Sequence, residues 1–195
     1  MVKVSFFPLL AFLVAVHPSL LCQNEQLNIS HLRFADGVSL SEQESATIID
    51  QVEGTSCPAD GLQRCIAARV RNAFQEHGYF KAVVRGVSVK SPHSISEVEA
   101  TVAANPGEVY RIAKFEVVGT LVFQKSELQP LITVVPGDIF DVRKVRETME
   151  NLRSYYTERG YGNTSFQPET STDETKHTVI LRLRVDASSA SSDSP

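Results

Sequence analysis

GEVYRIAKFEVVGT, residues 107–120, opens the stretch of sequence that decides the fold of this protein. Ala113, Phe115 and Val117 alternate there with charged residues, so the segment predicts a strand that is buried on one face. The next segment, LVFQKSELQPLITVVPGDIF at 121–140, predicts a first helix and ends on a Pro-Gly turn signal. Pro130 lies inside that helix and should shorten or kink it.

DVRKVRETMENLRSYYTERG, residues 141–160, predicts the longer helix of this half. Asp141 suits the N-cap, and Phe140 before it can pack on Val145 as a hydrophobic staple. Gly160 is typical of a left-handed C-cap. Residues 161–166 and 178–185 then predict two strands of a hairpin. The apolar face of the helix comprises Val142, Val145, Met149, Leu152, Tyr155 and Tyr156, at steps of three and four residues.

The resulting order is strand, helix, helix, strand, strand, and it resembles the polypeptide-transport-associated (POTRA) domain. The resemblance covers residues 107–186. It implies an α+β fold in which a three-stranded sheet packs on two helices. The motifs that carry it are Phe115…Gly119, Pro136-Gly137-Asp138…Phe140, Asn151-Leu152…Tyr156 and Arg159-Gly160-Tyr161.

Residues 24–105 predict a second, more diverged copy of the same domain. Leu32 and Phe34 indicate a first strand, and a capping box at 39–42 starts a helix. A second helix ends at Gly78, a long strand covers 79–89, and a last strand covers 98–102. The fold class is therefore α+β, with two tandem β-α-α-β-β domains at 24–105 and 107–186.

The two halves share a helix ending, since His77-Gly78-Tyr79 matches Arg159-Gly160-Tyr161 at an offset of 160 − 78 = 82 residues. At that offset Val70 falls on Leu152, and Phe74 falls on Tyr156. The alternative is that two unrelated α+β segments share only this ending. A common strand topology in both halves would favour the repeat.

Residues 1–22 predict a secretory signal peptide, because a lysine precedes an apolar run too short to span a membrane. Cys22 leaves lipidation open as an alternative to ordinary cleavage. Residues 187–195, ASSASSDSP, predict a disordered tail. Proteins that share the resemblance continue into a transmembrane β-barrel, whereas this sequence ends in that tail, so we expect a domain pair without the barrel.

Cys57 and Cys65 predict a structural disulfide, since an exported chain with two nearby cysteines is most simply oxidised. A redox or metal site is the alternative. Its spacing is wrong, because the pair is not C-x-x-C and no second ligand pair lies nearby.

Catalytic and nucleic-acid-binding signatures are missing from the sequence. The formal net charge is −4, with no stretch that interleaves basic and aromatic residues, which argues against a nucleic-acid partner. Nucleophile-elbow, Walker, zinc-protease and dinucleotide motifs are all absent. We therefore expect no enzyme activity, cofactor, metal site or small-molecule substrate.

The resemblance implies a periplasmic or outer-membrane-associated module of a Gram-negative-type bacterium. Such domains bind extended polypeptides along an open sheet edge, and they dock assembly or secretion components or a separately encoded barrel. Two candidate edges follow by position, and the sequence leaves open which of them is free. The candidate residues are Tyr161, Gly162, Asn163, Thr164, Ser165 and Phe166 in one strand, and Tyr79, Phe80, Lys81, Ala82 and Val83 in the other.

Two other functions stay open at this point. One is a small secreted enzyme whose catalytic groups are scattered along the sequence, which a deep pocket with several perturbed pKa values would favour. The other is a scaffold in cell-envelope division, which would follow an uncleaved anchor helix.

Overall fold

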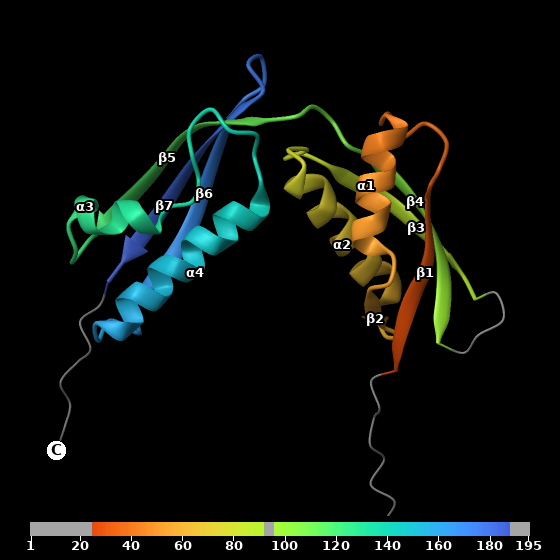
Figure 1. Ribbon diagram of the computed structural model, residues 1–195, viewed down its shortest axis with the longest axis horizontal. Coiled ribbons are helices and arrows are strands. Elements are labelled where there is room, and N and C mark those ends of the chain that lie inside the picture. The colour runs from red at the N-terminus through yellow and green to blue at the C-terminus, as the bar shows by residue number, and fades with distance from the viewer. Residues whose placement is uncertain (1–24, 92–95, 188–195) are drawn as a thin grey trace, which may run out of the picture.

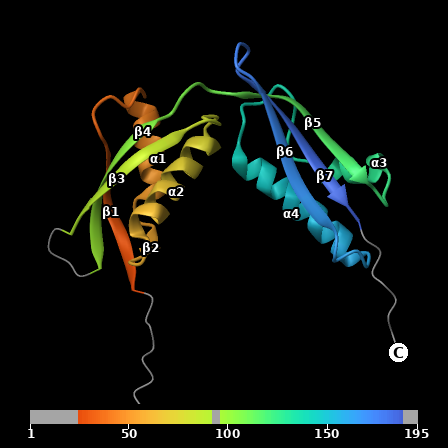
Figure 2. The same cartoon turned by 180° about the vertical axis from the view of Figure 1, so that it is seen from behind.

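The computed structural model describes residues 25–91 and 96–187. The predicted signal peptide and residues 188–195 of the predicted tail lie outside this range. The described chain forms two units, each with a sheet on one side and helices on the other (Figure 1). From behind, the two long helices, α2 (Leu62–Glu76) and α4 (Val142–Glu158), lie on the inner side of an arch, and the chain crosses between the units at its top (Figure 2).

The first unit packs two helices on a four-stranded sheet of order β2-β1-β4-β3. Strand β1 is parallel to β4, and β3 is antiparallel to β4. The prediction of three strands missed β2, a three-residue strand that pairs with the start of β1. The elements are β1 (Gln26–Phe34), α1 (Glu42–Val52), β2 (Ser56–Pro58), α2 (Leu62–Glu76), β3 (Val83–Lys90) and β4 (Glu97–Asn105).

The second unit repeats this topology with three strands in the order β5-β7-β6. Strand β5 is parallel to β7, and β6 is antiparallel to β7, as β1, β4 and β3 are in the first unit. The predicted α+β class is thus confirmed, and the elements of this unit follow one another along the chain in the predicted order of strand, helix, helix, strand, strand. The elements are β5 (Arg111–Thr120), α3 (Lys125–Leu128), η1 (Gln129–Leu131), α4 (Val142–Glu158), β6 (Ser165–Asp173) and β7 (Thr178–Asp186).

Proline shortens the first helix of the second unit, as predicted. Helix α3 is only four residues long, and Pro130 lies in the 3-10 turn η1 that follows it. At the start of α4, Asp141 is the N-cap and accepts a hydrogen bond from the Arg143 N–H at 2.8 Å.

The equivalent helices α2 and α4 end in the same way. Gly78 and Gly160 have φ angles of 93° and 86°, the left-handed region that favours glycine. In each case the N–H of the next tyrosine bonds the carbonyl five residues back: Tyr79 to Phe74 at 3.1 Å, and Tyr161 to Tyr156 at 2.9 Å. Val70, Leu152, Phe74 and Tyr156 are all fully buried.

Two local predictions were wrong by one or two residues. The capping box of α1 joins Ser41 to Glu44, so it begins two residues later than predicted. In β5 a bulge between Ile112 and Lys114 shifts the alternation, so that Ile112 is buried and Ala113 is exposed. A bulge leaves no mark in a pattern of apolar residues, because it is a backbone adjustment to the neighbouring strand.

The structure contains a disulfide between Cys57 in β2 and Cys65 in the first turn of α2, with an S–S length of 2.02 Å. Cys57 is fully buried. The bond therefore anchors the short strand to the helix that covers the sheet. Closing so short a loop restricts the unfolded chain and stabilises the fold by about 2–3 kcal/mol.

Tyr156 has a buried hydroxyl group with no hydrogen-bond partner in the described part of the chain. Its ring packs edge-to-face against Phe123 at 4.9 Å and Phe166 at 5.4 Å. Burial raises the pKa of this phenol. The first unit has Phe74 at the equivalent position, so the repeat tolerates the ring without its hydroxyl group.

We expect Tyr156→Phe to raise the free energy of unfolding of the second unit by about 1 kcal/mol, because it removes an unpaired buried hydroxyl. The reciprocal Phe74→Tyr should lower the stability of the first unit by about 1–3 kcal/mol for the same reason. Urea unfolding of both variants measures this. A clear loss of stability in Tyr156→Phe would mean that the hydroxyl has a partner in solution.

Candidate functional site

The edge strands of the two sheets differ in how many backbone N–H and C=O groups they leave free to pair with a further strand. Strand β2 is three residues long, includes Pro58, and is tied to α2 through its disulfide. Strand β5 is covered at its start by the loop before α4. The Ile112 N–H donates to the Asp138 carbonyl at 2.8 Å, and the Gly137 N–H donates to Ile112 at 2.7 Å.

Strand β6 is the other edge strand of the second sheet, and its sequence makes it less able to pair with an added strand. Pro168 lies near its middle, opposite Leu183 of β7. Proline has no N–H, so this edge lacks one donor that an incoming strand would need. The flank toward α4 is occupied, because the ring of Phe166 packs on Tyr156 and lies under the Arg153 guanidinium at 5.8 Å.

Strand β3 forms an open edge of the first sheet. It is eight residues long, contains no proline, and pairs on one side only, with β4. Val84, Val87 and Val89 turn toward the core, whereas the Val83 side chain is 54% exposed. A bulge between Val84 and Gly86 inserts Arg85 into the strand without covering its outer edge.

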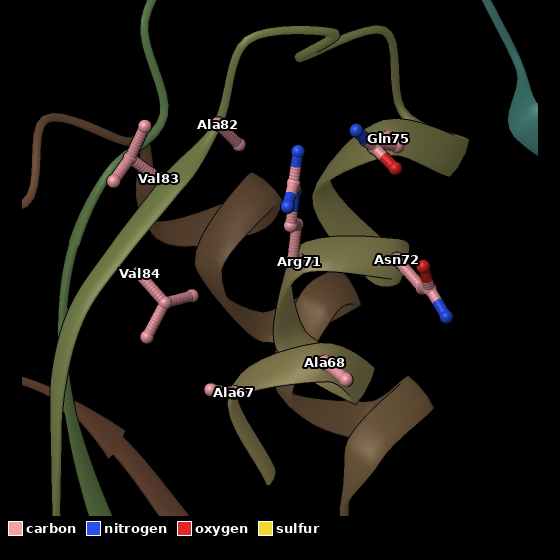
Figure 3. A pocket seen from close by; sticks show the side chains of 8 residues that line it. All are labelled: Ala67, Ala68, Arg71, Asn72, Gln75, Ala82, Val83 and Val84. Carbon is pink, nitrogen blue, oxygen red and sulfur yellow. The ribbon is translucent and has the colours of Figure 1, made fainter. Parts of the chain in front are cut away.

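A groove of about 530 Å³ runs between the open edge of β3 and helix α2 (Figure 3). We call it the β3 groove. Figure 3 shows the start of β3 on one side and α2 on the other, with the arginine side chain standing between them. Its lining is Ala67, Ala68, Arg71, Asn72, Gln75, Ala82, Val83 and Val84.

Small side chains keep the groove open. At the offset of 82 residues, Ala67 corresponds to Met149 and Val84 corresponds to Phe166. Met149 and Phe166 both pack against the core of the second unit. The larger side chains therefore fill in the second unit the space that alanine and valine leave free in the first.

Four of the predicted edge residues in the first unit lie outside β3. The chain turns before the strand begins, since the Phe80 N–H bonds Gly78 at 2.8 Å and the Ala82 N–H bonds Tyr79 at 3.0 Å. Tyr79 to Ala82 are therefore not edge residues, and only Val83 of the predicted set is in the strand. The chain reverses after Gly78 so that Tyr79 packs against the end of α2, and β3 therefore begins only at Val83.

Tyr79 is buried in the core of the first unit and is not part of an edge strand. Its ring meets Phe74 at 5.8 Å, and its hydroxyl donates to the Glu44 carboxylate at 2.7 Å. Burial, followed by the bond to Glu44, raises the pKa of Tyr79. Hydrogen bonds from Ser41 and then Tyr79 lower the pKa of Glu44 to about 2.

The equivalent segment of the second unit behaves in the same way. The Thr164 N–H and hydroxyl both donate to the Tyr161 carbonyl, at 3.1 and 2.7 Å, and β6 begins only at Ser165. Tyr161 to Thr164 therefore form a turn, and Ser165 and Phe166 alone of that predicted set lie in the edge strand.

Phe80 joins the two units. Its ring lies 4.8 Å from Phe140 and 5.8 Å from Tyr110, both of which belong to a core cluster of the second unit. The Tyr110 N–H also donates to the Gly78 carbonyl at 2.9 Å. A Cβ at Gly78 would lie 2.5 Å from a methyl of Ile139, so no larger residue fits there without a shift.

Charged groups flank this junction. Lys81 pairs with Glu174, and the Tyr110 hydroxyl donates to the same carboxylate at 2.6 Å. Hydrogen bonds from Lys81, Tyr110 and Thr172, in that order, lower the pKa of Glu174 to about 2. On the helix side, Arg143 of α4 lies 3.7 Å from Glu76 of α2.

Within residues 25–91 and 96–187, no group of three or more histidine, cysteine, aspartate or glutamate side chains is placed to hold a metal ion. In the same ranges, no helix has the length and apolar character needed to cross a membrane.

Residues 110–188 match the family model described as POTRA, surface antigen variable number repeat. Together with the strand order, this match identifies a POTRA domain in the second unit. The chain therefore contains a POTRA domain at residues 110–188.

One curated relative is the outer membrane protein assembly factor BamA of Buchnera aphidicola subsp. Acyrthosiphon pisum, strain APS. It is 24% identical over 117 residues, which cover 60% of this chain. The match spans only 19% of the length of that relative.

Two solved structures share the fold over most of this chain. The crystal structure of POTRA3-5 of Haemophilus influenzae BamA matches with a TM-score of 0.63 and 22% identity, over 84% of this chain and 67% of that one. BamA from Haemophilus ducreyi lacking POTRA domains 1-3 matches with a TM-score of 0.56 and 17% identity, over 83% of this chain and 29% of that one.

We expect Phe80→Ala to free the two units from each other, because it removes the ring that bridges their cores. Nuclear spin relaxation at neutral pH should then give separate, faster tumbling for each unit, while each keeps its own chemical shifts. Val122→Ala, an exposed site outside the junction, is the control. Unchanged joint tumbling of Phe80→Ala would show that the ring does not hold the junction.

We also expect the junction to loosen in acid. Because the pKa of Glu174 in the folded protein lies below its ordinary value of 4.5, at about 2, its contribution is complete above about pH 4.5. It is lost as the pH falls from there toward 2. Relaxation measured between pH 7 and 3 should detect this, and Glu174→Gln should remove the pH dependence. An equal acid response in that variant would assign the effect to other groups.

Proposed function

We propose that this protein is a non-enzymatic binding module that adds an extended polypeptide as a further strand along β3. Its place is the periplasm or the inner face of the outer membrane of a Gram-negative-type bacterium. There it serves the assembly or secretion of outer-membrane proteins, and its partners are unfolded polypeptides or components of that machinery.

The open edge of β3 beside a groove is the observation that carries this proposal. An edge strand presents unpaired N–H and C=O groups at the strand repeat, and a peptide in extended conformation can pair with them. Every second side chain of that peptide would then project over α2. The β3 groove offers space there, lined by Ala67, Ala68 and Val84.

The comparisons support the setting of this function. The family match is to a POTRA domain, and the relative from Buchnera is named as an outer-membrane protein assembly factor. Main-chain pairing reads little sequence, so such an edge suits a protein that handles many unfolded chains. We expect weak binding, because the peptide must lose conformational freedom when it becomes a strand.

The perturbed acids support a binding role over an enzyme. Glu44 and Glu174 have pKa values lowered to about 2, and each lowering has a structural cause in a cap or at the junction. A general acid or base for use near neutral pH requires a shift in the opposite direction. The β3 groove contains no histidine or carboxylate.

Hydrogen exchange of the labelled protein tests the proposal directly. We expect the neutral peptide acetyl-Thr-Val-Thr-Gln-Thr-Val-Thr-amide, at millimolar concentration, to protect alternate amides of β3, since only those pointing outward gain a partner. Amides of β6 serve as the internal control and should not change. Protection of β6 instead of β3, or of neither strand, would contradict the proposal.

A variant that copies the second unit provides the matched control. Ala67→Met with Val84→Phe places in the β3 groove the side chains that fill the equivalent space beside β6. This variant should keep the fold and lose the protection of β3 amides, because the projecting side chains of the peptide no longer have room.

A further inference from the structure

The β3 groove lies in an unusually basic part of an acidic protein. The whole chain has a formal net charge of −4, but residues 62–75 and 81–90, which include α2 up to Gln75 and β3, contain no acidic residue. They contain six basic residues: Arg64, Arg69, Arg71, Lys81, Arg85 and Lys90.

Two of these six cations have structural partners. Arg69 donates to the Ser56 carbonyl at 2.6 Å, and Lys81 pairs with Glu174. In the described part of the chain the other four, Arg64, Arg71, Arg85 and Lys90, have no hydrogen bond or ion pair. Their charge is therefore available to a ligand of opposite sign.

Arg71 is the free cation inside the groove. Figure 3 shows its side chain extending between β3 and α2 toward the level of Ala82, while Asn72 turns away. The neighbouring walls are apolar and small, formed by Ala68, Ala82 and Val84. A carboxylate that projects from an added strand would meet the guanidinium here, and the guanidinium can bind it through two parallel hydrogen bonds.

The spacing along α2 matches the spacing along a strand. Ala67 and Arg71 are four residues apart on one helix face, which is about 6 Å of helix axis. Two residues of a strand span about 6.7 Å, and they point to the same side. A small apolar side chain against Ala67 and an acid against Arg71 therefore fit positions two apart in one peptide.

Resting on the proposed function, we propose that Arg71 makes the β3 edge selective for extended segments with an aspartate or glutamate two residues from a small apolar side chain. Backbone pairing supplies the general affinity, and Arg71 supplies the preference. The second unit lacks this device, because the equivalent Arg153 lies over the ring of Phe166 and the space beside it is filled.

Paired peptides test the selectivity. The neutral peptide described above is compared with acetyl-Thr-Val-Thr-Glu-Thr-Val-Thr-amide, which differs from it by one carboxylate and carries valine on both sides at the required spacing. We expect the acidic peptide to bind about two- to five-fold more tightly, the range for a partly exposed ion pair. The difference should shrink when salt is raised to about 0.5 M, because salt screens exposed charges.

Three variants assign the preference to its residue. In Arg71→Gln both peptides should bind with the affinity of the neutral one. In Arg71→Glu the acidic peptide should bind more weakly than the neutral peptide, and a peptide with lysine in place of the glutamate should bind more tightly. Arg153→Gln is the matched control and should keep the preference for the acidic peptide.

The outcomes separate the two proposals. Equal binding of the acidic and neutral peptides, or a preference that survives in Arg71→Gln, overturns the selectivity and leaves strand addition intact. Absence of binding for both peptides overturns strand addition and the selectivity together.

Discussion

The left-handed glycine that ends the second long helix of each unit is the constraint on which the rest of the structure depends. Gly78 and Gly160 let the chain reverse so that the next tyrosine donates to the carbonyl five residues back and its ring returns to the core. Because of this turn, the following strand begins a few residues later and lies at the edge of the sheet. In both units that strand is an edge.

The residues that follow this shared turn make different contacts in the two units. In the first, the turn carries Phe80 into the core of the second unit, so the same few residues set the junction and the start of the open edge. In the second, Phe166 folds back onto Tyr156 and closes the flank of its strand. One topology therefore yields an accessible edge at β3 and a protected edge at β6. The difference depends on the small side chains of Ala67 and Val84 and on Pro168, which removes a backbone donor from β6.

Much of this architecture could be predicted from the sequence, because helix stripes, caps and glycine turns are local signals. The stripe from Val142 to Tyr156, the N-cap at Asp141 and the effect of Pro130 all follow from residue types at fixed spacings. Strand β2 and the bulge beside Ala113 depend on a neighbouring strand, and a single sequence does not record which strand that is.

The candidate site was less predictable. A tyrosine after a glycine is compatible with both a strand and a turn, so the sequence placed the edge four residues too early in each unit. The β3 groove exists because several of its lining side chains are small. An alanine in a sequence does not indicate whether the space beside it is empty or filled by a neighbouring residue. The comparison of Ala67 with Met149 at the repeat offset was a usable signal, but only the structure shows that those positions flank an edge strand.

Cross-strand nuclear Overhauser effects between a bound extended peptide and the protein test the central claim most directly, because they identify the strand that the peptide joins. The account predicts contacts between backbone protons of the peptide and those of β3, together with contacts from alternate peptide side chains to the methyl groups of Ala67 and Ala68. Contacts to β6 or β5, or contacts confined to side chains with no backbone pairing, would contradict it.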